Sequence, residues 1–334
     1  MIMPPMAEES KAPRPRIVVT ERASESAVAR LRSAGEVTIL TRCDEAALIA
    51  AAADADAFVV RTYSEVTARV IAAAKQAGRL RVIGRAGVGL DNIDVRAAVE
   101  AGITVVYTPA ASTNAVADLV VSLILALQRQ IIRGDSGIRQ GEFASLRAAK
   151  PTPVELRHQT LGVIGMGRIG RAVSHRLANG FGMRVIYHDI REIGWLPFVA
   201  ESRDCAEAVY READVVTYHV PLTPLTRGMV NTESLAQFRK GAYLVNTSRG
   251  PVVEAKALAE ALQSGHLAGA ALDVHEPEPP PADYPLYSAP NCILTPHIAS
   301  RTTESLAAMN DVVDDVIAVL SGKEPQYPAD SEQY

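Results

Sequence analysis

The chain has 334 residues, 48% of them hydrophobic, which is long for one compact domain and leads us to expect two domains with sizeable cores. Its 34 Lys and Arg residues against 38 Asp and Glu give a formal charge of -4, which excludes a general attraction to nucleic acid or to an anionic membrane. The three cysteines, Cys43, Cys205 and Cys292, are scattered and odd in number, which argues against a disulfide framework or a metal cluster and favours the cytoplasm.

The first 15 residues lack an apolar stretch, so we expect a disordered leader and neither a signal peptide nor an anchor. From Arg16 the chain alternates β-branched runs with Ala-rich stretches, which predicts a parallel α/β sheet. The expected strands are RIVV at 16–19, EVTIL at 36–40, AFVV at 57–60, RVIG at 81–84 and ITVV at 103–106.

An apolar stretch from Ala115 to Leu127 contains Asp118 and Ser122 and is too short to cross a bilayer, so it predicts a buried helix. A second series of strands follows it, which indicates a second doubly wound sheet. These strands are LGVIG at 161–165, RVIYHD at 184–189, DVVTYHV at 214–220, AYLVN at 242–246, AGAALDV at 268–274 and CILT at 292–295. Apolar residues from Leu306 to Leu320 with helical spacing, ending near Gly322, predict one amphipathic helix that folds back on the first sheet.

A glycine motif follows the first strand of the second series. Gly165, Gly167 and Gly170 fit G-x-G-x-x-G and precede a helical stretch, where they allow a tight turn, close approach of a pyrophosphate and helix packing. The next strand ends in Asp189, at the position where an acid accepts the ribose hydroxyls of NAD. Arg191 is placed to meet the 2'-phosphate of NADP, but Asp189 would repel that phosphate, so we expect NAD as the cofactor.

Three later segments follow strands of the second series, at the edge where doubly wound sheets bind ligands. Each supplies one chemically useful group, namely Arg249, Glu278 and His297. Reduction of a 2-oxo acid needs a cation for the carboxylate, a proton donor and a carboxylate that orients that donor. Arginine provides a planar fork, histidine titrates near neutral pH, and a glutamate beside it favours the imidazolium and fixes its tautomer.

The sequence closely resembles the D-isomer-specific 2-hydroxyacid dehydrogenases, which include glyoxylate, hydroxypyruvate and phosphoglycerate dehydrogenases. The resemblance covers Arg16 to about Gly322. It is carried by GRAGVGLDNID at 84–94, VIGMGRIG at 163–170, HVPLTPLTRGMVN at 219–231, NTSRG at 246–250, ALDVHEPEP at 271–279 and TPHIAS at 295–300.

The resemblance implies that Arg249, Glu278 and His297 form the active site of an enzyme that acts on small D-2-hydroxy acids. It implies that the backbone of Gly87, Val88 and Gly89 binds the substrate carboxylate and that Asp273 orients the nicotinamide. Further residues that would line the cofactor site are Arg168, Ile169, Val220, Pro221, Thr226, Thr247 and Ser248.

The resemblance also implies a Rossmann NAD-binding domain, residues 113–298, inserted into a flavodoxin-like substrate domain, residues 16–112 and 299–322, with the active site in the cleft and tails at 1–15 and 323–334. Pairing through the long helices after position 113 would make a homodimer.

Many phosphoglycerate dehydrogenases continue into a regulatory domain, and we expect no serine feedback here. Relatives usually have an aromatic residue where this chain has His275, which leaves the polarity of the pocket open.

Arg61 and Arg85 end strands of the first series, and each is either a substrate contact or an ordinary solvated cation. If they are contacts, they favour a substrate with a polar or anionic tail, such as hydroxypyruvate or a phosphorylated three-carbon acid. His219 is expected to be a hydrogen-bonded wall of the cofactor site. The chain lacks H-E-x-x-H and paired C-x-x-C spacings, so we expect no metal.

Two alternatives remain open at this point. One is an NAD(H)-sensing, corepressor-like binding protein, against which the complete Arg-Glu-His set argues. The other is a formate or phosphite dehydrogenase. Formate enzymes have an amide where Glu278 stands, which weakens that option.

Overall fold

The computed structural model describes residues 13–148 and 153–330. Most of the expected leader, residues 1–12, therefore lies outside the described residues, as do residues 331–334 of the expected tail. The chain divides into two compact units, the first ending at Ala111 and resuming at Leu306, the second running from Ser112 to Ser305. The second unit is thus inserted into the first.

The first unit is built on a five-stranded parallel sheet of order β2-β1-β3-β4-β5, which is the flavodoxin order. Side chains alternate across the sheet, so that Ile17 and Val19 pack on one face and Val18 on the other. The strands are β1 (Arg16–Val19), β2 (Glu36–Ile39), β3 (Ala57–Val60), β4 (Val82–Arg85) and β5 (Thr104–Tyr107).

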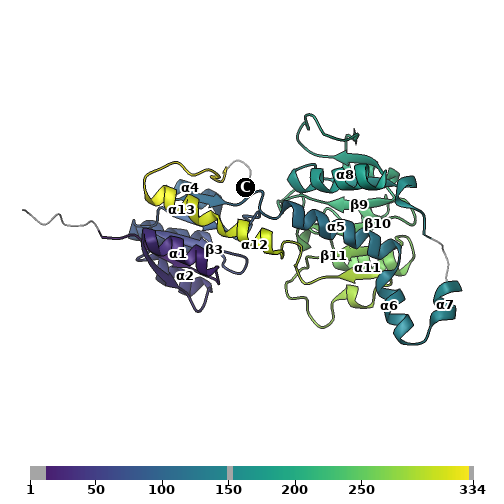
Figure 1. Ribbon diagram of the computed structural model, residues 1–334, viewed down its shortest axis with the longest axis horizontal. Helices are drawn as coiled ribbons and strands as arrows, with labels where there is room; N and C mark the ends of the chain where they lie inside the picture. The colour runs from purple at the N-terminus through teal and green to yellow at the C-terminus, as the bar shows by residue number, and fades with distance from the viewer. Residues whose placement is uncertain (1–12, 149–152, 331–334) are drawn as a thin grey trace, which may run out of the picture. The chain divides into compact units, whose positions relative to one another are not determined.

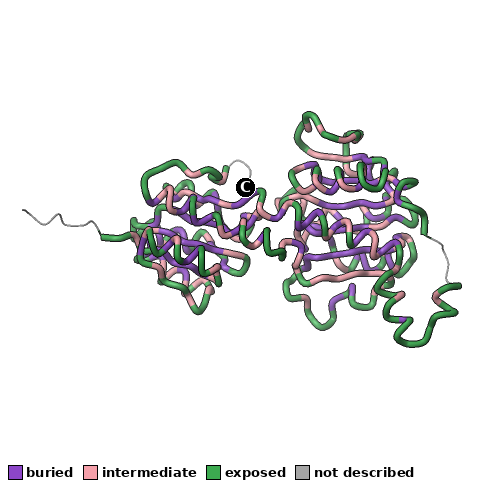
Figure 2. The backbone as a smooth tube through the Cα atoms, in the orientation of Figure 1, coloured by how far each residue is buried: buried purple, intermediate pink, exposed green. Residues whose placement is uncertain are grey.

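Helices cover both faces of this sheet, so its strands are mostly buried, except for the exposed edge strand β2 (Figures 1 and 2). Each of the first four helices begins at a Ser, Asp or Thr whose side chain accepts a backbone N–H of the first turn, which satisfies one of the exposed donors there. The helices are α1 (Glu25–Ala34) and α13 (Val312–Leu320) on one face, and α2 (Glu45–Ala52), α3 (Ala68–Ala77) and α4 (Val95–Glu100) on the other.

The C-terminal segment differs from the single helix expected from the sequence. It forms two helices, α12 (Thr303–Asn310) and α13, separated at Asp311. The guanidinium of Arg30 binds the backbone carbonyl of Asn310 and the carboxylates of Asp311 and Asp314, and the N–H of Asp314 bonds to the carbonyl of Asp311. These bonds replace the regular helical pattern at the break.

The sequence predicts a simple tail after residue 322, but these residues contact the first sheet. The carboxylate of Asp315 accepts the backbone N–H groups of Gln326 and Tyr327, and Pro328 forms an antiparallel bridge with Val106 of β5. This part of the chain therefore adds to the edge of the first sheet. Conversely, residues 299–305 fall in the second unit, where Ala299 donates its N–H to Asp273.

The second unit contains a seven-stranded parallel sheet of order β12-β11-β10-β9-β6-β7-β8, in which the strand order reverses between β6 and β9. This is the Rossmann arrangement with an additional strand, and its ligand crevice lies beyond the carboxyl ends of the strands at the reversal. The strands are β6 (Thr160–Ile164), β7 (Arg184–His188), β8 (Glu201–Ser202), β9 (Val215–Tyr218), β10 (Tyr243–Asn246), β11 (Gly269–Leu272) and β12 (Cys292–Leu294).

Two apolar cores lie on the two faces of this sheet. Figure 2 shows that most of its strands are buried. The expected buried helix is α5 (Thr113–Gln128), which packs with α8 (Arg168–Phe181) on one face (Figure 1). The opposite face is covered by α9 (Ala206–Glu212), α10 (Thr232–Leu235) and α11 (Ala255–Gln263). After α5 come α6 (Ile131–Arg139) and α7 (Phe143–Ala148), which extend from the unit (Figure 1).

Within the described residues, none of the helices by itself has the length and apolar composition needed to cross a bilayer. The two helices α5 and α6 together have that length and composition, but their axes are bent by 57° relative to each other.

Candidate active site

The glycine motif lies in the turn from β6 to α8. Gly165 has a φ of +91°, and a Cβ atom there would lie 2.5 Å from the carbonyl oxygen of His219. A Cβ atom at Gly170 would collide with the carbonyl oxygen of Gly165, so only glycine lets the helix pack this closely. Gly167 caps the helix N-terminus at Arg168, and the space around it is open apart from the Arg191 guanidinium. The turn therefore has the shape and polarity of a pyrophosphate cradle.

Asp189 follows β7 and lies against this turn. Its side chain is 4% exposed, Oδ2 accepts the backbone N–H of Met166 at 2.8 Å, and Oδ1 accepts that of Arg191 at 2.9 Å. The Arg191 side chain is 66% exposed and its Nε donates to the same oxygen at 3.4 Å. A carboxylate offers about four acceptor sites, so Asp189 retains capacity for a ribose hydroxyl.

The segment after β9 forms the neighbouring wall. Thr226 donates its hydroxyl to the carbonyl of Pro221 at 2.6 Å and accepts the N–H of Thr223 at 2.9 Å, which fixes this loop beside Val220. Nε2 of His219 lies 3.1 Å from Oγ1 of Thr217, and burial lowers the pKa of His219 to about 3. His219 is therefore neutral near pH 7.

The turn after β10 carries Arg249. The fully buried Asn246 organises this turn, because its Oδ1 accepts both the N–H and the hydroxyl of Ser248 and its Nδ2 donates to the carbonyl of Arg249. The guanidinium of Arg249 is partly exposed and donates to the Ser248 carbonyl at 2.7 Å. A Cβ atom at the following residue, Gly250, would collide with the carbonyl of His275, so this turn packs directly on the acidic loop.

Asp273, at the end of β11, holds the TPHIAS segment in place. Its fully buried carboxylate accepts the hydroxyl of Thr295 at 2.6 Å and the N–H groups of Ile298 and Ala299 at 2.9 and 2.8 Å. Its backbone carbonyl accepts the N–H of His297 at 2.8 Å. His297 has a φ of +52°, a left-handed conformation that is uncommon for residues other than glycine and that these bonds maintain.

Glu278 and His297 form a hydrogen-bonded pair in which Nδ1 lies 2.8 Å from Oε2, and each side chain is about one-third exposed. The other carboxylate oxygen accepts the N–H of His275 at 2.8 Å. Partial burial by itself raises the pKa of Glu278, but the hydrogen bonds from His297 and from the backbone of His275 outweigh it and lower this pKa below its usual value. Glu278 is therefore ionised near pH 7 and favours a charged imidazole beside it.

The predicted residues of the first unit lie at the carboxyl ends of β3 and β4: Arg61 follows β3, Arg85 is the last residue of β4, and Gly87, Val88 and Gly89 come after it. Arg61 is partly exposed and donates to the carbonyl of Arg22 at 3.0 Å. Arg85 is 9% exposed, and its guanidinium donates to the carbonyl of Ala86 and covers Gly87, whose φ is +150°. Arg85 is thus not an ordinary solvated cation. Val88 and Gly89 are partly exposed.

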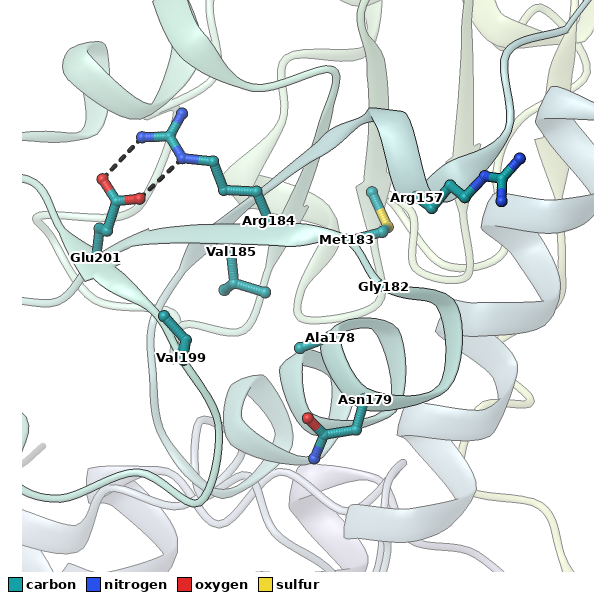
Figure 3. A pocket seen from close by; sticks show the side chains of 9 residues that line it. All are labelled: Arg157, Ala178, Asn179, Gly182, Met183, Arg184, Val185, Val199 and Glu201. Carbon is teal, nitrogen blue, oxygen red and sulfur yellow. Dashed lines mark hydrogen bonds and ion pairs between the residues drawn. The ribbon is translucent and has the colours of Figure 1, made fainter.

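A surface pocket at the opposite edge of the second sheet is separate from these residues. It lies at the amino end of β7, where Arg184 and Glu201 form an ion pair of 2.7 Å, and Asn179 and Arg157 also line it (Figure 3). All the candidate residues of the second unit follow the carboxyl ends of strands. The pocket therefore does not belong to the candidate site.

Sequence reasoning missed the polar residues that hold the site together. Asn246 and the loop-holding role of Asp273 were not foreseen, although a buried Asn at the end of an apolar strand is a signal that the following turn needs an internal hydrogen-bond partner. In the first unit, one carboxylate oxygen of Glu21 accepts the N–H groups of Arg61, Tyr63 and Ser64 and fixes the loop after β3. Glu21 and this loop are distant in the sequence and meet only in the folded sheet, so the spacing along the chain does not predict the contact.

Comparisons with known proteins agree with this geometry. Residues 121–299 match the family model described as "D-isomer specific 2-hydroxyacid dehydrogenase, NAD binding domain". The chain is 42% identical over 315 residues to a D-3-phosphoglycerate dehydrogenase of Methanocaldococcus jannaschii, covering 92% of this chain but 58% of that one. It is 37% identical over 325 residues to a glyoxylate reductase of Thermofilum pendens, covering 93% of each.

Among solved structures, the fold is similar to an NADPH-dependent glyoxylate/hydroxypyruvate reductase from Sinorhizobium meliloti in complex with NADP and malonate. The identity is 33%, the TM-score is 0.85, and the match covers 96% of this chain and 98% of that chain.

Proposed function

Because the chain belongs to the D-isomer-specific 2-hydroxyacid dehydrogenase family, we propose that it interconverts a small D-2-hydroxy acid and its 2-oxo acid, with NAD as cofactor. The observation that carries the proposal is the 2.8 Å pair of His297 and Glu278 on a loop that packs against the Arg249 turn. An acid, its orienting carboxylate and a cation are what ketone reduction requires.

The described residues fit an NAD cofactor. The open space at Gly167 and the helix N-terminus at Arg168 and Ile169 would hold the pyrophosphate, and Asp189 would hold the adenosine ribose. Bound NAD(H) supplies or accepts the hydride. Other residues proposed to line the cofactor site are Gly165, Gly170, Val220, Pro221, Thr226, Thr247, Ser248 and Asp273.

In the proposed reduction, Arg249 binds the substrate carboxylate and polarises the ketone through its guanidinium fork. His297 donates a proton from Nε2 to the ketone oxygen, because Nδ1 is engaged with Glu278. Glu278 stabilises the imidazolium before the transfer and keeps the ring oriented. In the oxidation the same histidine accepts the hydroxyl proton.

We propose that NAD is preferred to NADP, because the Asp189 carboxylate would face the 2'-phosphate. The structural relative from Sinorhizobium meliloti is NADPH-dependent, so family membership alone does not decide the choice. Arg191, the cation that we assign to a 2'-phosphate, already donates from Nε to Asp189 in this chain, which weakens its attraction for a phosphate.

In the first unit, we propose the backbone of Gly87, Val88 and Gly89 as the site for the substrate carboxylate. Arg61 and Arg85 are proposed to favour a polar or anionic tail. The position of the Arg85 guanidinium against Gly87, beside the proposed carboxylate site, supports this assignment.

We also propose a homodimer in the cytoplasm. The extending helices expose Ile131, Ile132, Ile138 and Phe143, each more than half exposed, which is an apolar surface suited to a second copy of the chain. Light scattering should give a dimer for the native chain and a monomer for a double Ile132→Asp, Phe143→Asp variant. Val99→Asp, at another exposed apolar position, is the control and should remain dimeric. A native monomer would contradict this assignment.

The direct test of the proposed function is NADH oxidation by the purified chain with glyoxylate, hydroxypyruvate, pyruvate and a phosphorylated three-carbon oxo acid. We expect turnover of at least one of these oxo acids, and a lower kcat/KM with NADPH than with NADH. Tight NADH binding without turnover of any of them would instead favour an NAD(H)-sensing binding protein.

A further inference from the structure

His275 contacts Glu278 directly and contacts Thr295, two residues before His297, without belonging to the Glu278–His297 pair. The residue is 7% exposed, and its backbone N–H donates to Oε1 of Glu278 at 2.8 Å. Its ring Nε2 lies 3.0 Å from the backbone carbonyl of Thr295, two residues before His297. The same residue therefore touches the acidic loop through its backbone and the TPHIAS segment through its side chain.

The partners of the ring identify the atom that donates. A carbonyl only accepts hydrogen bonds, so Nε2 of His275 carries a proton and donates to Thr295. Nδ1 lies 3.4 Å from the hydroxyl of Tyr284, and the two rings meet edge to face with centroids 5.6 Å apart. Tyr284 therefore packs on one side of the ring while Nε2 bonds to the loop that carries His297.

The Thr295 carbonyl links this ring to the catalytic loop. It also accepts the backbone N–H of His297 at 3.0 Å, while the Thr295 hydroxyl donates to Asp273. The carbonyl is thus bonded on one side by the His275 ring and on the other by the backbone of the proton donor. His297 adopts a left-handed conformation at this point, which needs such external bonds to persist.

We propose that His275 is a positioning residue that fixes Glu278 through its backbone and His297 through Thr295, an inference that rests on the proposed function. An aromatic residue, which the family resemblance led us to expect here, would reproduce the edge contact with Tyr284. It would not donate a hydrogen bond to Thr295. The histidine therefore adds orientation of the proton donor.

The kinetic test compares His275→Phe, which keeps the ring but loses the donor, with His275→Gln, whose amide nitrogen restores a donor near the position of Nε2. Loss of one neutral hydrogen bond at this position should lower kcat of His275→Phe about three- to tenfold, with the KM for the oxo acid and the Kd for NADH within about twofold of the native values. His275→Gln should recover kcat to within about twofold. Native kcat in His275→Phe, or equal losses in both variants, would overturn the proposal.

A second measurement does not depend on turnover or on the folding of any variant. Side-chain ¹⁵N NMR of the native full-length chain near pH 7.5 should show a hydrogen-bonded proton on Nε2 of His275 and another on Nδ1 of His297. An Nε2 of His275 without a proton would overturn the proposal. Absence of turnover with every oxo acid, together with the expected Nε2 proton, would instead reject the proposed function and leave the His275 bonds established.

Discussion

Nδ1 of His297 and Oε2 of Glu278 lie 2.8 Å apart, while the second oxygen of the same carboxylate is held by a backbone N–H. Glu278 is ionised because these bonds lower its pKa, so it stabilises a positive charge on the neighbouring ring. The protonated ring is the form that donates in ketone reduction.

Glu278→Gln should therefore shift the pH profile of ketone reduction toward lower pH, because the imidazolium loses its partner and gives up its proton earlier. The measurement is kcat/KM for the oxo acid between about pH 5 and pH 9. Glu276→Gln, in the same loop, is the control and should leave the profile unchanged. An unchanged profile in Glu278→Gln would show that the two residues are not coupled in catalysis.

Asp189→Ser should raise the efficiency with NADPH relative to NADH, because it removes the carboxylate that repels the 2'-phosphate and frees the Arg191 side chain. A charge-assisted hydrogen bond contributes about 1.5 to 3 kcal/mol, so the ratio of kcat/KM with NADPH to kcat/KM with NADH should rise about 10- to 150-fold. Steady-state kinetics with both cofactors measure it, with Glu192→Gln as the neighbouring control. A native enzyme that already prefers NADPH would contradict the assigned role of Asp189.

The folded chain should lose stability on acidification through His219. Its folded-state pKa of about 3 lies below the ordinary value near 6.5, so between these values the unfolded chain binds a proton that the folded chain does not. The free energy of unfolding therefore falls as the pH drops below about 6.5, by up to about 1.4 kcal/mol per pH unit from this group.

His219→Gln should reduce that dependence in urea unfolding measured near pH 7.5 and near pH 5. His158→Gln, at an exposed position, is the matched control and should follow the native chain. The same loss of stability in native and His219→Gln proteins would mean that other groups cause the acid sensitivity.

Arg61→Ala and Arg85→Ala should raise the KM for an oxo acid with an anionic tail about 10- to 150-fold, and much less for glyoxylate, which has no tail. Because Arg85 is buried, thermal unfolding of its variant must be measured as well, whereas Arg61 is partly exposed and gives the cleaner result. Equal effects on both substrates would show that these arginines do not distinguish the tails.

The strands of both sheets were predictable because each is a short apolar run followed by turn residues, and the observed bounds differ from the expected ones by one or two residues at most ends. The short strand β8 was missed, since Glu201 and Ser202 are exposed and polar and pair only with the edge of β7. The break at Asp311 was missed because it depends on Arg30, which is distant in sequence.

The sequence predicts which residues belong to the candidate site, but it does not predict the hydrogen bonds that hold them together. The glycine motif and the Arg249, Glu278 and His297 segments could be read from the chain because each follows a strand. The bonds of Asn246 and His275 could not, because they join loops that meet only in the folded sheet.

The central claim is that His297 is the proton donor, and the turnover of His297→Ala tests it most directly. General acid catalysis contributes about 10²- to 10⁴-fold, so kcat for reduction of the best oxo acid should fall by that factor. NADH binding should be retained, because the proposed cofactor contacts lie elsewhere. The exposed His158→Ala is the control and should keep native turnover. A His297→Ala enzyme with native kcat would contradict the account.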